Sequence, residues 1–474
     1  MKHLPDLIRA MQEKRLVLFL GSGFSAECKF PDWSGLVKPI AKDLNYELTD
    51  ETDYSLLFQY YQDKNNNRNV LNNLIRDIFY SYPTDLPNHE LLAKLPVTEF
   101  WTTNYDKTIE DSLKKVNRRV DVKTSVESLS MMLSGADCTV YKMHGDLCSP
   151  EKCILTKDDY ERYGDTHEPF INILKRTLIE KTVLFIGYSF NDQDLRAILS
   201  TVRKYYNNNF STHYWVTKRV IDSQSRIKQE LFEQNLLNYG IQTIEIDDFT
   251  EISDLLKNLY LQSRMNSVFI SGASAEAEKE NENNIRHLFI KQLSAKLIKY
   301  DMKIVNGYGL GVGSDVVEGA YAEIYRDNAF KDSSNYIKLY PFYQSQITTK
   351  DTDKEEFKEN YRNEMLRQVG FAIFIYGTKL VDGKIVDSTG LQDEFRIANE
   401  NDVIIIPVGS TGGISKKIWN EVFNKPKDYG YDTDELKGLL KILIDVEPNE
   451  MDNKDLLSAI FKIIEIKRGE VNGK

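Results

Sequence analysis

The sequence predicts an α/β protein made of two Rossmann-like, doubly wound domains, each built on a parallel sheet. In the first half, short apolar runs such as Leu16–Leu20 alternate with longer helical patterns such as 53–61 and 70–80. This alternation is typical of parallel strands joined by helices. At Ser267 the pattern starts again with an apolar strand and a small-residue loop. We therefore expect one domain over residues 1–264 and another over residues 265–474.

Length and composition exclude several classes of protein. The chain has 474 residues, 41% of them hydrophobic and 28% charged, which suits soluble domains with sizeable cores. Its net charge of -11 argues against a broad nucleic-acid surface, which needs clustered Lys and Arg. The sequence contains neither a long apolar span nor a signal-peptide core. We expect a cytoplasmic protein that binds neither membrane nor nucleic acid.

We expect the candidate site residues to lie along one edge of each sheet, in the loops that follow its strands. Ligands of doubly wound sheets bind beyond the carboxyl ends of the strands. In the first domain the further strands are expected at Glu99–Thr102, Val140–Met143, Val183–Ile186, His213–Val216 and Gln242–Ile246. In the second domain they are expected at 267–271, 302–306, 371–376 and 403–408, with a helix over 283–300.

Polar or glycine-rich segments follow four strands of the first domain. They are Gly21-Ser22-Gly23-Phe24-Ser25, Thr103-Asn104-Tyr105-Asp106, His144-Gly145-Asp146 and Gly187-Tyr188-Ser189-Phe190-Asn191. A Gly-x-Gly loop after a strand lets backbone N–H groups approach a pyrophosphate, although it also fits a plain tight turn. The combination of four such segments predicts a dinucleotide site.

Two of these segments supply side chains suited to breaking a glycosidic bond. The amide of Asn104 can hold a ribose hydroxyl or a water, although asparagine is also common in turns. His144 can accept a proton near neutral pH, although a lone histidine more often completes a hydrogen bond in the core. Asp106 and Asp146 suit either the orientation of these groups or the capping of helices.

Taken together, the four segments resemble the sirtuin superfamily over residues 8–250. Gly21-Ser22-Gly23-Phe24-Ser25 is similar to its first glycine loop, Thr103-Asn104-Tyr105-Asp106 to its T-x-N-x-D segment, and His144-Gly145 to its His-Gly pair. The resemblance implies that NAD+ lies on the first loop and on Gly187, Ser189 and Asn191 of the later loop. It also implies that Asn104 positions the nicotinamide ribose, that His144 is the base and that Asp106 belongs to the catalytic set.

The cysteines depart from the sirtuin pattern. Protein-deacylating sirtuins usually carry a four-cysteine zinc module after His-Gly, whereas this interval holds only Cys148 and Cys153. We therefore expect no metal, and expect water to attack NAD+ and yield nicotinamide and ADP-ribose, as in a zinc-free sirtuin-like branch of prokaryotic defence proteins. NAD-dependent protein deacylation and non-catalytic binding of NAD or ADP-ribose remain alternatives.

The second half resembles the Rossmann-like SLOG family. The matching segments contain Gly272 and Ser274, then Gly309, Leu310, Gly311 and Gly313, then Gly377 and finally Glu394. The hydrolytic members carry a Pro-Gly-Gly segment that is only partly matched at Gly377, which favours ligand sensing. Arg367 can supply a bidentate phosphate contact and Lys379 a second cation, although solvated charges are the ordinary explanation for both.

A sirtuin-like domain followed by a SLOG domain resembles the NAD-consuming effectors of the Thoeris antiphage system. The resemblance implies that the SLOG domain binds a cyclic ADP-ribose isomer made by a TIR-domain partner. It also implies that this ligand activates NAD+ hydrolysis in a homo-oligomer, expected to be a tetramer, and that NAD depletion leads to abortive infection.

Overall fold

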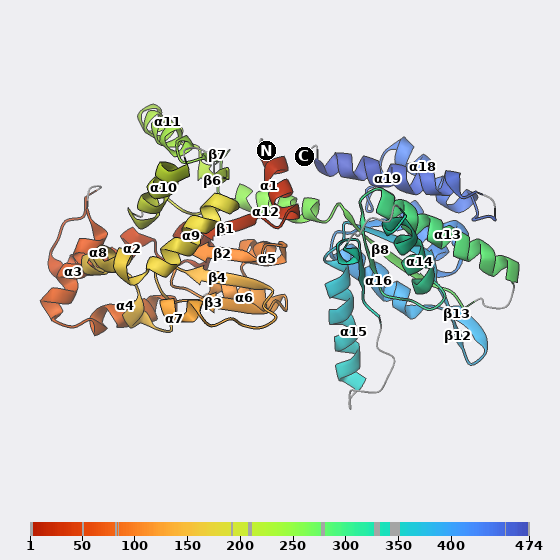
Figure 1. Cartoon of the computed structure of the whole chain (residues 1–474), viewed down its shortest axis with the longest axis horizontal. Coiled ribbons are helices and arrows are strands. Elements are labelled where there is room, and N and C mark those ends of the chain that lie inside the picture. The colour runs from red at the N-terminus through yellow and green to blue at the C-terminus, as the bar shows by residue number, and fades with distance from the viewer. Residues whose placement is uncertain are drawn as a thin grey trace. The chain divides into compact units, whose positions relative to one another are not determined.

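The chain folds into two compact units, Met1–Tyr260 and Leu261–Lys474 (Figure 1). The computed structural model describes residues 3–49, 52–80, 83, 85–190, 193–206, 211–275, 280–326, 332–341, 351–450 and 452–472. Within those ranges every helix is too short or too polar to cross a bilayer. Each unit contains one parallel sheet, so the predicted fold class is confirmed.

The first unit is built on a seven-stranded, wholly parallel sheet in the order β3-β4-β2-β1-β5-β6-β7. Its strands are β1 (Leu16–Leu20), β2 (Glu99–Thr102), β3 (Val120–Lys123), β4 (Cys138–Lys142), β5 (Thr182–Ile186), β6 (His213–Lys218) and β7 (Ile241–Ile246). The sequence predicted all of these strands except β3, a half-buried edge strand of four residues.

The helices of this unit are α1 (Leu4–Gln12), α2 (Trp33–Leu44), α3 (Tyr54–Asn65), α4 (Asn69–Phe79), α5 (Pro87–Lys94), α6 (Thr108–Lys115), α7 (Val126–Leu129), α8 (Lys157–Thr166), α9 (Glu168–Glu180), α10 (Gln193–Tyr206), α11 (Ser223–Leu237) and α12 (Glu251–Ser263). Two short 3₁₀ helices, η1 (Ser22–Cys28) and η2 (Pro150–Lys152), complete it.

Helices cover both faces of the first sheet because its strands are apolar on both sides. Successive residues of β1 alternate between two separate cores, with Leu18 in one and Phe19 in the other. The first core includes residues of α1, α5, α6 and α12, and the second includes residues of α8, α9 and α10. Helices α2, α3 and α4 form a core of their own that also contains Tyr105 and Leu155.

The register of the central strands places the four predicted segments side by side. Thr102 at the end of β2 pairs with Leu20 of β1 and with Lys142 of β4, and Leu20 pairs with Ile186 of β5. Because parallel strands share their carboxyl edge, the loops that follow them start at one level. The prediction that all four segments lie at this edge is confirmed.

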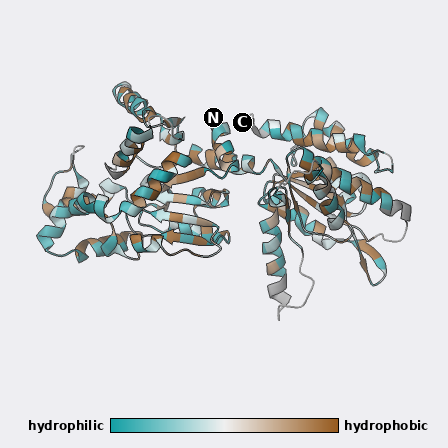
Figure 2. Cartoon of the chain, in the orientation of Figure 1, coloured by the Kyte–Doolittle hydropathy of each residue, from teal (hydrophilic) through white to brown (hydrophobic). Residues whose placement is uncertain are grey.

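The second unit has a five-stranded parallel sheet in the order β10-β9-β8-β11-β14. Figure 2 shows hydrophobic residues concentrated in the strands of both units. The strands of the second unit's sheet are β8 (Ser267–Ala273), β9 (Lys303–Asn306), β10 (Ile337–Leu339), β11 (Phe371–Tyr376) and β14 (Ile404–Pro407). The second unit also has an antiparallel hairpin of β12 (Thr378–Val381) and β13 (Lys384–Asp387). Its helices are α13 (Glu280–Lys299), α14 (Gly313–Ile324), α15 (Asp351–Leu366), α16 (Thr389–Glu400), α17 (Gly413–Asn424), α18 (Asp434–Asp445) and α19 (Lys454–Asn472), with η3 (Ser333–Asn335) and η4 (Gly409–Thr411).

Candidate functional site

The first glycine loop and the later glycine loop meet at the point where the strand order of the first sheet reverses. The chain leaves β1 toward β2 on one side and leaves β5 toward β6 on the other. Doubly wound sheets bind nucleotides at such a point, beyond the carboxyl ends of the two strands. The N–H of Gly21 donates to the carbonyl of Ile186, and that of Gly23 donates to Gly187, both at 2.9 Å. A Cβ atom on Gly21 would lie 2.3 Å from the Gly187 oxygen, so glycine is needed for this close backbone contact.

This double loop presents both exposed and buried members of the predicted binding set. Ser22, Gly23 and Ser189 are exposed, whereas Phe24 is buried with its ring 4.6 Å from that of His89. Asn191 lies outside the described residues. Exposed backbone and hydroxyl groups next to a reversal of strand order can hold the phosphates of a dinucleotide.

Asn104, Ser25 and Asp106 form one buried hydrogen-bond network. The Asn104 amide donates from Nδ2 to the Gly21 carbonyl and to the Ser25 hydroxyl, both at 3.1 Å. That hydroxyl in turn donates to Oδ2 of Asp106 at 3.2 Å. The structure therefore brings together three residues that the sequence singled out on two different loops, and it ties Asn104 directly to the glycine loop.

The two aspartates of the site each accept hydrogen bonds from nearby backbone N–H groups. Asp106 also accepts from the N–H of Thr108, the first residue of α6, at 3.0 Å, and so connects Ser25 to the start of this helix. Asp146 accepts from the N–H of Cys148 at 2.7 Å and pairs with Lys142 at 2.5 Å. Both carboxylates thus fix loops beside Asn104 and His144.

His144 is enclosed by aromatic rings. The residue is only 1% exposed. Its ring lies edge-on to those of Tyr160 and Tyr163 of α8, and the ring centroids are 5.5 and 5.7 Å away. The Tyr163 hydroxyl donates to the carbonyl of Met143 at 3.2 Å, which fastens α8 to the His144 loop. In this conformation the imidazole is therefore almost entirely closed off from solvent.

A buried lysine that sequence reasoning missed lies under the same loops. Lys142 is fully buried at the end of β4 and contacts Glu110 of α6 as well as Asp146. Burial alone would lower the pKa of Lys142, but the two carboxylates raise it overall, so the ammonium group stays charged. The signal in the sequence was a lysine within the predicted strand Val140–Met143.

The described residues contain no cluster of three or more His, Cys, Asp or Glu side chains placed to hold a metal ion. Cys28, Cys138 and Cys153 are buried and Cys148 is exposed, all as free thiols. Burial raises the pKa of the Cys153 thiol to about 12, so this thiol is protonated at neutral pH.

The loops of the second unit also pack backbone against backbone, here after β8 and β9. The N–H of Ser274 donates to the Leu310 carbonyl at 3.0 Å, and a Cβ on Gly309 would lie 2.2 Å from the Gly272 oxygen. Gly311 has a φ of 71°, in the left-handed region that favours glycine. Gly313 begins α14 directly after this loop. Five predicted ligand residues are thereby brought together: Gly272, Ser274, Gly309, Leu310 and Gly311.

Gly377 and Lys379 lie next to this double loop. The N–H of Gly377 donates to the carbonyl of Ala273 at 2.8 Å, at the end of β8. Lys379 of the hairpin donates to the hydroxyl of Thr389 at 3.0 Å, at the start of α16. A buried arginine, Arg286 of α13, donates to the Ser274 hydroxyl at 3.0 Å. The sequence did not single out this arginine.

Glu394 and Arg367, two of the predicted ligand residues, have different neighbours in the second unit. Glu394 is buried on α16, where it accepts from the Ser271 hydroxyl at 2.5 Å. The buried guanidinium beside it belongs to Arg362, which pairs with Asp393 at 3.1 Å and stabilises the Glu394 carboxylate. Arg367 follows the end of α15 and lies near Tyr340, the residue after the edge strand β10, where it opposes the rise in the pKa of the phenol that burial causes.

The buried carboxyl of Glu394 predicts a pH-dependent stability. Burial raises the pKa of Glu394 from 4.5 to about 7, against the opposing effects of Ser271 and Arg362. Because the folded chain holds this proton more tightly than the unfolded chain, its contribution to stability is complete below about pH 4.5 and is lost as the pH rises through 7. Its loss amounts to roughly 3 kcal/mol.

Thermal denaturation of the full chain and of Glu394→Gln, from pH 5 to pH 8, measures this effect. Since glutamine does not ionise, the melting temperature of the variant minus that of the wild type is expected to rise across this range. Other titrating groups cancel in the difference. A difference that stays constant with pH would show that Glu394 ionises as an exposed glutamate does.

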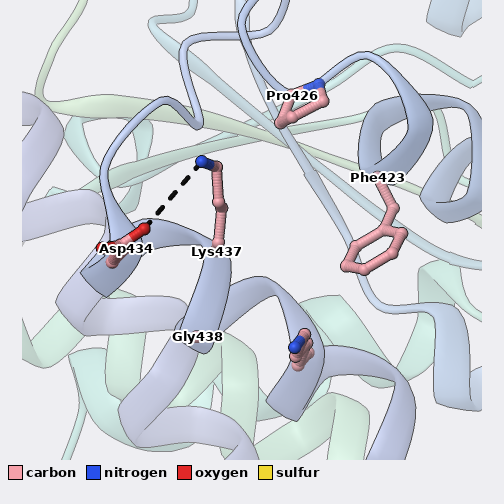
Figure 3. A pocket seen from close by; sticks show the side chains of 6 residues that line it. Phe423, Pro426, Asp434, Lys437 and Gly438 are labelled. Atoms are coloured by element: carbon pink, nitrogen blue, oxygen red, sulfur yellow. Dashed lines mark ion pairs between the residues drawn. The ribbon is translucent and has the colours of Figure 1, made fainter.

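A surface pocket of about 370 Å³ lies between α17 and α18 of the second unit (Figure 3). It is lined by Phe423, Pro426, Asp434, Lys437, Gly438 and Lys441. Lys437 pairs with Asp434 at 4.0 Å, so the charge on one side of the pocket is already compensated. None of the candidate residues lines this pocket.

Comparison with known proteins relates both units to described families. Residues 98–244 match the model of the SIR2-like domain, and residues 251–467 match the Sir2- and TIR-associating SLOG family. The chain is 35% identical to the NAD(+) hydrolase ThsA of Bacillus cereus (strain MSX-D12), over 98% of this chain and 97% of that protein. It is 35% identical to the NAD(+) hydrolase ThsA of Cytobacillus dafuensis, over 97% and 95%, and 33% identical to that of Acinetobacter baumannii (strain 532279), over 88% and 89%.

Proposed function

Because this chain belongs to the family of ThsA NAD(+) hydrolases, we propose that its first unit cleaves NAD+ to nicotinamide and ADP-ribose and that a nucleotide bound to its second unit controls the reaction. The observation that carries the proposal is the shared edge of the first sheet. There the Ser25–Asn104–Asp106 network joins the glycine loop, and His144 follows the neighbouring strand at the same level.

The proposed reaction breaks the bond between C1′ of the ribose and the nicotinamide nitrogen, and the bonding electrons leave with nicotinamide. A water oxygen bonds to C1′ and its proton passes to His144, the general base. Asn104 holds the ribose and the water, and exposed groups of the two glycine loops hold the pyrophosphate. A confined ribose with an aligned water meets most needs of an oxocarbenium-like transition state.

The enclosed His144 supports the proposal that the described conformation is a resting one. An imidazole beneath Tyr160 and Tyr163 cannot accept a proton from a bound water. A ligand can activate such an enzyme only if it binds the open arrangement more tightly than the closed one. We place that ligand at the Gly272 and Gly309 loops, with Arg362, Lys379 and Glu394 as polar contacts.

We propose a cyclic ADP-ribose isomer as this ligand, made by a TIR-domain protein, and a cytoplasmic homotetramer as the working form. The Sir2- and TIR-associating SLOG match supports a functional link to TIR proteins. Paired glycine loops beside Arg286, with Arg362 beside Asp393 and Glu394 of α16, suit a ligand with phosphate groups. Rapid loss of NAD+ after activation would then account for abortive infection during phage attack.

Nicotinamide release from NAD+ tests the proposal. The full-length protein is incubated with NAD+ alone, with candidate cyclic ADP-ribose isomers, and with an acylated peptide. We expect at least one isomer to start release without the peptide. Release that requires the peptide and yields O-acyl-ADP-ribose would favour deacylation, and binding without turnover under every condition would favour a sensor.

A further inference from the structure

The buried ammonium group of Lys142 lies between the two loops that carry Asn104 and His144. Its Nζ donates to the carbonyl oxygens of Tyr105, at 3.3 Å, and Asp106, which belong to the loop of Asn104. It also donates to Oδ2 of Asp146 at 2.5 Å, in the loop of His144. One side chain thus contacts both loops at once.

The remaining contacts anchor this arrangement to the body of the unit. Oε1 of Glu110, on α6, accepts from Lys142 Nζ at 3.1 Å. Lys142 itself pairs with Thr102 of β2, the strand that leads into Asn104. A third link joins the loops without Lys142, because the N–H of Leu147 donates to the carbonyl of Tyr105 at 3.0 Å. The loops can therefore stay close when the lysine is replaced, although they lose the one side chain that is hydrogen-bonded to both of them.

Burying the charged groups of this cluster costs desolvation free energy that a purely structural contact would not need. A fully buried ammonium must recover its lost hydration from its partners, and apolar replacements of buried ion pairs are often as stable. Burial raises the pKa of Glu110, whereas for Asp146 the charge and hydrogen bond of Lys142, together with the hydrogen bond from the N–H of Cys148, outweigh burial and lower the pKa. The ammonium thus keeps Asp146 ionised directly beside His144.

From this geometry we propose that Lys142 is a positioning residue that fixes the loop of Asn104 against the loop of His144, so that the amide and the imidazole act on the same ribose. This inference rests on the proposed hydrolysis of NAD+. Lys142 is not placed to touch NAD+ itself, so it acts through the two loops. Its removal should therefore lower kcat far more than it changes KM.

The test compares four full-length variants under conditions in which the wild type releases nicotinamide. Lys142→Met keeps the length of the side chain without its charge. Lys142→Met combined with Glu110→Gln also keeps the net charge of the cluster. Lys142→Arg keeps the charge in a different shape. Lys123→Met is the matched control, because Lys123 is a buried lysine at the end of β3 whose partners are Asp121 and the carbonyl of Met131.

We expect the double variant to melt near the wild type and to lose about 100-fold in kcat with KM changed only a few-fold, since misplacement by about 1 Å costs on the order of 10²-fold. Lys142→Arg should recover part of this loss, and Lys123→Met should keep the wild-type kcat. A folded double variant with wild-type kcat would overturn the inference, as would an equal loss in Lys123→Met.

If both methionine variants unfold, Lys142→Arg decides the question. A folded arginine variant with kcat reduced at least tenfold supports the positioning role, and one with unchanged kcat and KM overturns it. Failure of the proposed function gives a different pattern, because the wild type itself would then release no nicotinamide with any candidate activator.

Discussion

Replacing His144 with alanine is expected to lower the kcat of activated NAD+ hydrolysis by about 10²- to 10⁴-fold, the usual contribution of a general base. The reason is that His144 is the only histidine in the four segments that follow β1, β2, β4 and β5. The nearby His167 stacks on Tyr163, one of the two rings that contact His144, with ring centroids 4.6 Å apart. Nicotinamide release under activating conditions is the measurement.

The size of the buried imidazole requires a control for folding. Alanine at this position leaves space beneath Tyr160 and Tyr163, so a loss of activity can also follow from a collapsed site. His144→Gln fills more of that space and still cannot act as a base at neutral pH. Both variants should bind NAD+ and melt close to the wild type. Wild-type turnover by folded His144→Gln would remove His144 from the base role.

Prediction from sequence was most accurate where the chain is most regular. The central strands carry continuous apolar runs because helices cover both faces of the sheet, and runs of this kind stand out in a sequence. The loops that follow them were placed at the correct edge for the same reason. The edge strand β3 was missed because its four residues are only partly apolar and mostly half-buried.

The roles of individual loop residues depended on contacts that no motif encodes. The glycines of the first loop fit a pyrophosphate site, yet Gly21 is also required by its contact with Gly187, a residue 166 positions later in the chain. Lys142 was missed because lysine at the end of a strand ordinarily points to solvent. Only the tertiary fold brings Glu110 and Asp146 to it.

Arg362 on α15 and Arg367, just after the end of that helix, illustrate the same limit. Positions five residues apart on a helix point about 140° away from each other. The sequence therefore cannot place both Arg362 and Arg367 on the face that meets the ligand loops, and the pattern singled out Arg367. In the structure Arg362 reaches α16, where it lies beside Asp393 and Glu394, and Arg367 is on the side of Tyr340.

This difference gives a second prediction with a large expected effect. Arg362→Ala should raise the concentration of activator needed for half-maximal nicotinamide release by about 10- to 100-fold, because a hydrogen bond to a charged group contributes about 1.5–3 kcal/mol. Arg367→Ala, the variant that the sequence pattern favoured, should shift this concentration by less than about threefold, the range of most exposed charge pairs. A titration of activator against both variants compares them directly.

The paired design separates loss of the ligand contact from loss of structure. Arg362 also holds Asp393 and compensates the buried Glu394, so its removal can loosen α16. Arg362→Lys keeps a positive charge but cannot form a bidentate contact with a phosphate. It should melt like the wild type and still respond poorly to the activator. If Arg367→Ala loses the response while Arg362→Ala keeps it, the ligand binds toward the edge strand β10, and the proposed site at the Gly272 and Gly309 loops is wrong.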